Sequence, residues 1–255
     1  MQGKNIDEVI SHLEAIIQQS LTDENPMGYF AALYYQVTVT VKEGIDNGYF
    51  MDGKRMEMLD VIFANRYLEA YTQFQQDKQC TDSWRYAFIT TREYWPIVMQ
   101  NLLLGINAHI NLDLGIAAVL TCPGQGIHAL KDDFDKINVV LSGLVADVEK
   151  SLSIIWPRLK YLLLHVGKFD SFLIDFSMKQ ARDGAWKFAT ELAVLDPRQQ
   201  EAAIKDRDKK ITKIALLVSK PGFFISLLFL VIRIGEIGTV RKKIETLWKK
   251  NILIT

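Results

Sequence analysis

Apolar residues recur at intervals of three and four along most of this 255-residue chain, which is the spacing of an amphipathic α-helix. Residues 28–46 also alternate valine with threonine, but the length of the segment and the lack of a hairpin partner favour a helix. Segments with helical spacing lie at residues 5–21, 28–46, 52–76, 82–95, 96–120, 129–150, 170–195 and 197–218. We therefore expect an all-α protein whose residues 1–255 form a single domain of about eight to ten helices.

Residues 96–120 form the segment around which we expect the other helices to pack. A helix here has no broad charged face, which predicts that it is covered on every side. One apolar stripe of this helix is interrupted by two polar residues, His109 and Asp113. Buried polar groups need partners, and two side chains four positions apart can hydrogen-bond each other or share a metal ion.

Two further acids fall on apolar stripes of predicted helices. Asp60 lies on the same side of its helix as Tyr67 and Tyr71, in an aromatic surrounding, and Asp133 lies in the apolar line of residues 129–150. Each acid has two interpretations: a structural carboxylate with hydrogen-bonding partners, or a metal ligand or general base. If the stripes face one core, both acids converge with His109 and Asp113.

Converging acids would each cost on the order of several kcal/mol unless a cation, arginines or shared protons compensate them. One histidine with carboxylates suits a divalent metal such as Fe, Mn, Zn or Mg, with His109, Asp113, Asp133 and Asp60 as ligands. The HExxH spacing of familiar helical metalloenzymes is absent. Two alternatives stay open: a metal-free pair in which Asp113 orients His109 as a general base, and a purely structural polar cluster.

Other side chains are candidates to line such a site. Arg182 lies at the boundary of an apolar stripe, where it can pair with a buried aspartate or hold an anionic substrate. We expect Arg182 to be a catalytic counter-charge together with His109, Asp113 and Asp60. The residues expected to contact substrate are Tyr67, Tyr71, Asn107 and Trp186.

Composition narrows the classes of partner. The chain has 30 basic and 30 acidic residues, so no global charge favours nucleic acid. Two distant cysteines give neither a disulfide framework nor a thiolate zinc site, and the acidic, amphipathic N-terminal segment is not a signal peptide, so we expect a cytoplasmic protein. No segment reaches roughly 18 unbroken apolar residues.

Charge is distributed unevenly, because residues 198–255 contain 13 basic and 5 acidic residues. Within this basic segment the apolar run FFISLLFLVIRIG is too short to span a bilayer. Residues 221–255 therefore have two interpretations: a buried capping helix with a solvated tail, or an interfacial anchor that draws the protein to anionic lipid.

Four motifs resemble an uncharacterised bacterial family of helical proteins of unknown function. They are FANRYLEAY at 63–71, LLLGINAHINLDLGIAA at 102–118, LKDDFDKIN at 130–138 and ARDGAWKFA at 181–189. The resemblance extends over most of the chain. It implies a helical fold and places His109, Asp113, Asp133 and Arg182 within shared motifs, without implying their roles.

No phosphate-binding loop, dinucleotide fingerprint or nucleophile elbow occurs in the sequence. The leading hypothesis is an enzyme that acts on a small, rather apolar molecule at a buried His/Asp site, as a metal-dependent hydrolase, lyase or cyclase or by metal-free acid/base chemistry. The alternative is a non-catalytic protein that binds a lipid-like ligand or associates peripherally with membranes.

Overall fold

The computed structural model describes residues 1–158 and 178–248, and the described chain is helical without any strand. The prediction of an all-α fold is confirmed, and residues 28–46 are helical rather than extended. The α-helices are α1 Ile6–Thr22, α2 Met27–Asp46, α3 Gly53–Gln75, α4 Asp82–Thr90, α5 Val98–Ala108, α6 Leu114–Thr121, α7 Lys131–Ile155, α10 Met178–Ala193, α11 Pro197–Ser219, α12 Phe223–Gly235 and α13 Val240–Trp248.

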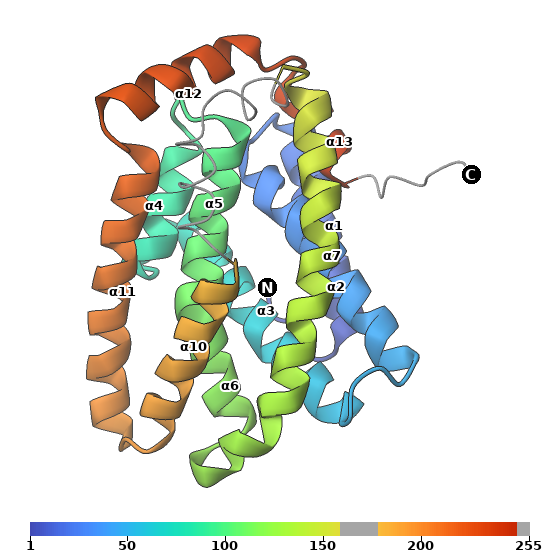
Figure 1. Cartoon of the computed structure of the whole chain (residues 1–255), viewed down its shortest axis with the longest axis vertical. Helices are drawn as coiled ribbons and strands as arrows, with labels where there is room; N and C mark the ends of the chain where they lie inside the picture. Colours follow the sequence, from blue (N-terminus) through green and yellow to red (C-terminus); the bar gives the residue numbers. More distant parts are fainter. Residues whose placement is uncertain (159–177, 249–255) are drawn as a thin grey trace.

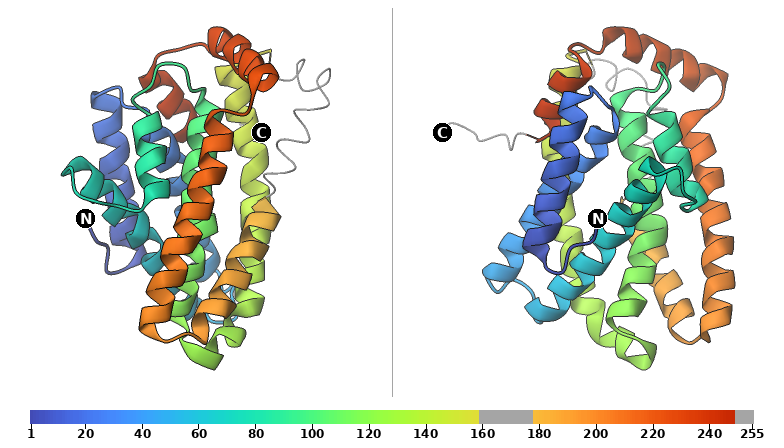
Figure 2. Two further views of the ribbon diagram at one scale, coloured as in Figure 1. Left: turned by 90° about the vertical axis from the view of Figure 1, so that its left-hand side faces the viewer. Right: turned by 180° about the vertical axis from the view of Figure 1, so that it is seen from behind.

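The segment predicted to be central is the axis of the bundle. α5, a π-helical turn and α6 follow one another through the middle of the molecule (Figures 1 and 2). α2, α4 and α11 pack on α5, whereas α3 and α10 pack on α6. Ten of the eleven residues of α5 are buried. The expectation of a central helix covered on all sides is therefore confirmed.

The sequence had predicted one regular helix for the central segment, but the structure shows an interruption in it. Its middle, His109–Asp113, is a π-helical turn in which the backbone N–H of Leu114 donates to the carbonyl of His109. Such turns place one extra residue in a helix and are frequent at functional sites. Arg207 of α11 holds this turn by donating from Nε to the backbone carbonyl of Asn111 at 3.0 Å.

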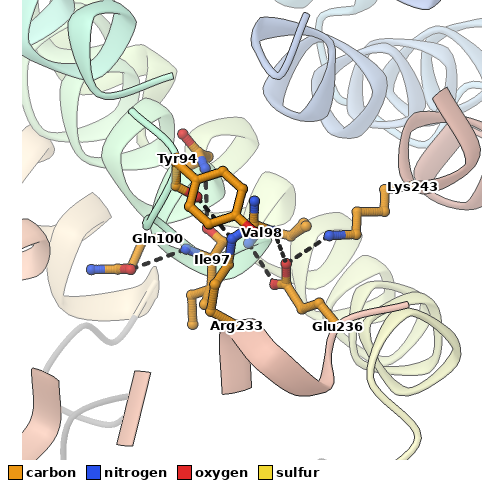
Figure 3. Close-up of polar contacts among 8 residues, drawn as sticks. Tyr94, Ile97, Val98, Gln100, Arg233, Glu236 and Lys243 are labelled. Carbon is orange, nitrogen blue, oxygen red and sulfur yellow. Dashed lines mark hydrogen bonds and ion pairs between the residues drawn. The ribbon is translucent and has the colours of Figure 1, made fainter. Parts of the chain in front are cut away.

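Three buried acids hold the N-termini of helices to which they do not belong. Asp208 of α11 accepts from the first two backbone N–H groups of α4, and Asp133 of α7 accepts from the two N–H groups that precede α3. Glu236 accepts from the N–H of Val98, at the start of α5 (Figure 3). These N–H groups lack partners within their own helices, and the positive end of the helix dipole favours a carboxylate.

α12 lies across one end of the bundle, roughly crosswise to its long axis (Figures 1 and 2). Its axis is bent by 64° from that of α11, and only as a bent pair do these two helices have the length and apolarity of a membrane span. One continuous described stretch, Val98–Thr121, also passes that test, but 89% of its most apolar window is buried inside the protein. That burial is compatible with the core helix of a soluble protein.

Candidate functional site

Asp113, at the end of the π-helical turn, is fixed by three donors from three different segments. Arg66 of α3 donates from Nε to Oδ1 at 3.0 Å, and Trp84 of α4 donates from Nε1 to Oδ2 at 2.7 Å. His109 Nδ1 lies 3.2 Å from the same Oδ2. Burial alone would raise the pKa of Asp113, but Arg66, His109 and Trp84 outweigh it and hold the pKa below its ordinary value. Asp113 is therefore a buried carboxylate anion.

The imidazole of His109 is neutral and held in one tautomer. Burial lowers the pKa of His109 below its ordinary value, although the hydrogen bond to Asp113 acts in the opposite direction. Because an ionised carboxylate only accepts hydrogen bonds, Nδ1 carries the proton and Nε2 keeps its lone pair. Nε2 is buried and has no hydrogen-bond partner in the described part of the chain. We call His109, Asp113, Arg66 and Trp84 the His109 site.

Aromatic rings enclose the imidazole. The Phe63 ring is stacked on His109 with centroids 3.6 Å apart, and the Tyr34 ring meets it edge-on at 4.4 Å. Phe30 and Tyr67 lie farther out, at 5.8 and 6.2 Å. Phe30 approaches this closely because Gly105 of α5 has no side chain; a Cβ there would lie 2.4 Å from the Phe30 ring. Apart from Asp113, the side chains packed on the imidazole are thus aromatic.

Three more polar atoms near these rings are buried without a hydrogen-bond partner among the described residues: the hydroxyls of Tyr34 and Tyr67 and Oδ2 of Asp60. Burial raises the pKa of the Tyr34 hydroxyl, and the charges of Asp60 and Asp113 act in the same direction, so Tyr34 lies within electrostatic reach of both acids. Burial, reinforced by Glu57, raises the pKa of Asp60 to about 7. Unpartnered buried groups are rare and call for an explanation.

The structure does not bring Asp133 to the His109 site. Its two carboxylate oxygens accept from the backbone N–H groups of Met51 and Asp52 at 2.7 and 2.9 Å, and Lys136 lies 3.5 Å away. Burial would raise its pKa, but these donors lower it below the ordinary value. Leu130 and Asp133 at the start of the apolar stripe on α7 are buried, as expected, but Asp133 faces the α2–α3 connection.

The expected convergence of His109, Asp113, Asp60 and Asp133 on one metal ion is consequently not found. In residues 1–158 and 178–248 no group of three or more His, Cys, Asp and Glu side chains lies close enough to hold a metal. The one contact among the four expected ligands in that range is the His109–Asp113 pair.

Two of the residues expected to contact substrate lie elsewhere. Tyr71 lines an open surface pocket of about 580 Å³ together with Met1, Gln19 and residues of the α1–α2 connection. Trp186 of α10 packs on the Phe134 ring of α7 at 4.9 Å. The ring centroid of Tyr67 lies 6.2 Å from that of His109.

Asn107 and Arg182 are both buried and have different surroundings. Asn107 joins α5 to α11 by donating to the carbonyl of Ile211 at 3.1 Å, and its own oxygen accepts from Asn111. Arg182 has no partner for Nε or Nη1 in the described chain, and burial lowers its pKa to about 10. The counter-charge that pairs with Asp113 is Arg66, whereas Arg182 was the arginine expected to pair with a buried aspartate or an anionic substrate.

Sequence patterns did not predict that Arg66 and Trp84 belong to the His109 site or that the rings of Tyr34 and Phe63 contact the imidazole. Arg66 and Phe63 belong to FANRYLEAY, one of the motifs that carry the family resemblance, and this membership could have marked them as candidate site residues. Tyr34 and Trp84 lie on α2 and α4, and nothing in their spacing distinguishes them from ordinary core aromatics.

Comparison with known proteins gives a family without a described activity. Searches of the curated proteins and of the solved structures found no match. Residues 6–221, which include every residue of the His109 site, match the sequence model of DUF5995, a family of unknown function, and the chain belongs to that family.

Proposed function

We propose that this protein is an enzyme that transfers protons on a small, largely apolar molecule, with His109 as the general base. The observation that carries the proposal is the buried, unpartnered Nε2 of His109 beside a carboxylate that three donors hold in place. In general-base catalysis of this type, one ring nitrogen of a histidine accepts the proton while a fixed carboxylate holds the other ring nitrogen and orients the ring. Because the imidazole is neutral, it is ready to accept a proton at neutral pH.

Asp60 supplies the complementary acid in this proposal. With a pKa of about 7 it carries a proton in a large fraction of molecules near neutral pH, when His109 is unprotonated. Two titratable groups whose surroundings place them in opposite protonation states are a typical acid/base pair. The proton that Nε2 removes from substrate is matched by the proton that Asp60 donates, so the reaction is an isomerisation, elimination or cyclisation without net oxidation.

The substrate class follows from the walls of the site. Phe30, Phe63 and Trp84 offer apolar ring surfaces, and the hydroxyls of Tyr34 and Tyr67 offer hydrogen bonds to an oxygen of the substrate. Arg66 connects the site to solvent, because its side chain contacts Asp113 and is 27% exposed. In this proposal, substrate enters where movement of the Arg66 side chain exposes the His109–Asp113 pair.

Proton transfer can be detected before the substrate is known. Wild-type protein is incubated in D₂O with a small-molecule extract of cells, and mass spectrometry records which compounds gain deuterium or change structure. We expect one compound or a narrow series to exchange. His109→Gln and Asp60→Asn, verified as folded by circular dichroism, should each lower this exchange by about 100-fold or more.

A matched control uses another histidine. His12 of α1 is outside the site and its ring nitrogen lies 3.2 Å from the backbone carbonyl of Gln2, so His12→Gln should exchange at the wild-type rate. Equal exchange by folded His109→Gln and wild-type protein would contradict the proposal. Global unfolding of His109→Gln would instead identify the dyad as a structural element of the core.

A further inference from the structure

α12 is apolar on its solvent-facing side as well as on its packed side. Only two of its thirteen residues, Phe229 and Ile232, are buried. The most exposed are Phe223, Phe224 and Ile234, whose relative accessibilities are 77%, 84% and 76%. The exposed apolar residues of this helix, which we call the α12 face, are Phe223, Phe224, Leu227, Leu230, Val231 and Ile234.

The α12 face forms one continuous stripe. At 100° per residue these positions fall within roughly 120° of one another, opposite Phe229 and Ile232. α12 contains no acidic residue, and Arg233, its one charged residue, lies at the side of the stripe. Contiguous exposed apolar surface of this kind usually marks an interaction site.

Aromatic residues with polar ends lie next to α12. Arg233 donates from Nε to the carbonyl of Tyr94 at 2.8 Å and lies over its ring at 4.8 Å (Figure 3). Tyr94 and its neighbour Trp95, in the α4–α5 connection, are 71% and 61% exposed. Tyrosine and tryptophan at the edge of an apolar surface are typical of a membrane–water interface.

The charge of the same segment is positive. From Lys220 to Trp248 there are five basic and two acidic residues, and one of the two acids, Glu236, is neutralised by Lys243 and Arg233. Lys220 lies three positions before the first residue of α12, while Arg241 and Lys242 follow the helix in the first turn of α13, and all three are exposed. Exposed basic residues beside an apolar helix are attracted to an anionic lipid surface.

We propose that the α12 face docks on the surface of an anionic lipid bilayer, with the helix lying in the interfacial plane. The crosswise position of α12 at one end of the bundle lets the whole stripe meet a flat surface at once (Figure 2). A second copy of the chain fits less well, because a two-fold contact would bring the basic residues near α12 toward their own equivalents. This inference is independent of the proton-transfer chemistry at His109.

The test is co-sedimentation of the full chain with vesicles. Deleting residues 221–255 is unsuitable, because it removes Glu236, which holds the start of α5, and the buried residues of α13. Phe223→Ser with Phe224→Ser changes only exposed side chains. We expect wild-type protein to bind vesicles containing about 30% phosphatidylserine and not pure phosphatidylcholine, and to dissociate as salt is raised.

The double variant should lose binding by about tenfold or more, because two large side chains no longer enter the interface. The matched control is Met51→Ser with Val194→Ser, which alters side chains that are 71% and 70% exposed in the α2–α3 and α10–α11 connections, toward the other end of the bundle. The control should bind like wild type. Equal binding by the phenylalanine variant, absence of vesicle binding, or self-association that the variant abolishes would each overturn the proposal.

Discussion

α5 has a buried cluster of charged residues at each end, and the two clusters differ in how fully their groups are paired. At its N-terminus Glu236 accepts from the Val98 N–H at 2.8 Å, from Lys243 at 2.8 Å and from Arg233 at 3.1 Å (Figure 3). We call this the Glu236 cluster. The charged groups of Glu236 and Lys243 are buried and paired with each other. Its effect is to fix α12 and α13 to the start of the central helix.

At the other end of α5, the His109 site pairs its charge equally well but leaves neutral polar atoms without partners. Nε2 of His109 and the hydroxyls of Tyr34 and Tyr67 have none among the described residues. A buried unpartnered polar atom costs about 1–3 kcal/mol, which stability alone does not explain. The Glu236 cluster therefore stabilises the fold, whereas the His109 site has polar groups that are free to bind a ligand.

The largest effect expected at the Glu236 cluster comes from Glu236→Gln. This change leaves Lys243 charged and buried without a carboxylate, which should lower the free energy of unfolding by about 3–5 kcal/mol in urea denaturation. Glu245→Gln is the control, because its 3.8 Å contact with Lys242 is solvent-exposed and should contribute less than about 1 kcal/mol. Similar losses for the two variants would show that the cluster is not a structural clamp.

The pH dependence of the stability of Asp60→Asn tests the raised pKa assigned to Asp60. The pKa of Asp60 is about 7 in the folded protein and about 3.9 unfolded, so the folded state binds the proton more tightly. Its contribution to stability is complete below pH 4 and is lost as pH rises through 7, by on the order of 4 kcal/mol. At pH 8 Asp60→Asn should therefore be more stable than wild type, with the difference shrinking toward pH 4.

Urea denaturation at several pH values measures this difference. Asp206→Asn provides the comparison, because Lys210 holds the pKa of the exposed Asp206 below its ordinary value and the dependence should have the opposite sign. A pH profile of Asp60→Asn parallel to that of wild type would contradict the assignment of a raised pKa to Asp60.

Asp133→Ala should reduce stability without affecting the His109 site. Two backbone N–H groups at the start of α3 lose a charged acceptor, which should cost about 1–3 kcal/mol. Deuterium exchange into substrate should stay at the wild-type level while the protein is folded. Asp132→Ala, an exposed neighbour, controls for the loss of a first-turn acid. Loss of exchange in folded Asp133→Ala would restore Asp133 as a site residue.

Tyr34→Phe should have the smallest effect on stability and a clear effect on activity. Its hydroxyl makes no well-formed hydrogen bond in the described chain, although the Thr38 side chain is near enough to lower its pKa, so removing it should change the melting temperature little. The same change should slow deuterium exchange if Tyr34 holds substrate. Tyr35→Phe is the matched control: it removes a 2.9 Å hydrogen bond to Glu14, and should cost about 0.5–1 kcal/mol without slowing exchange.

Helical periodicity predicted which faces are buried but not which faces meet. The His109–Asp113 contact was predictable because the two residues are four positions apart in one segment. Asp60 and Asp133 both lie on inward-facing stripes, and sequence alone could not show that only Asp60 lies near Tyr34. Arg66 is 27% exposed at the edge of its stripe, so its pairing with Asp113 depends on the packing of α3 against the π-helical turn.

The same limit applies to α12. A segment that is apolar on every side gives no indication of which side lacks a neighbour, and both interpretations of residues 221–255 predicted a helix. The structure shows the apolar run as a helix that is largely exposed, followed by α13, whose Ile244 and Leu247 are buried. The sequence thus predicted the element, while its exposure became visible only in three dimensions.

The π-helical turn also sets the rotational phase of everything that follows it. Gly115 of α6 faces α10 so closely that a Cβ would lie 2.8 Å from the Phe188 ring and 3.0 Å from the Ala185 carbonyl. If residues 109–113 formed a regular α-helix with all five residues retained, α6 would be rotated by about 100° and would present a bulkier residue to α10 in place of Gly115, whereas deleting one of the five would leave α6 in phase. The π-helical geometry of this turn therefore affects two things: the position of the His109 imidazole, and the packing of α6 against α10, which is far from it in the sequence.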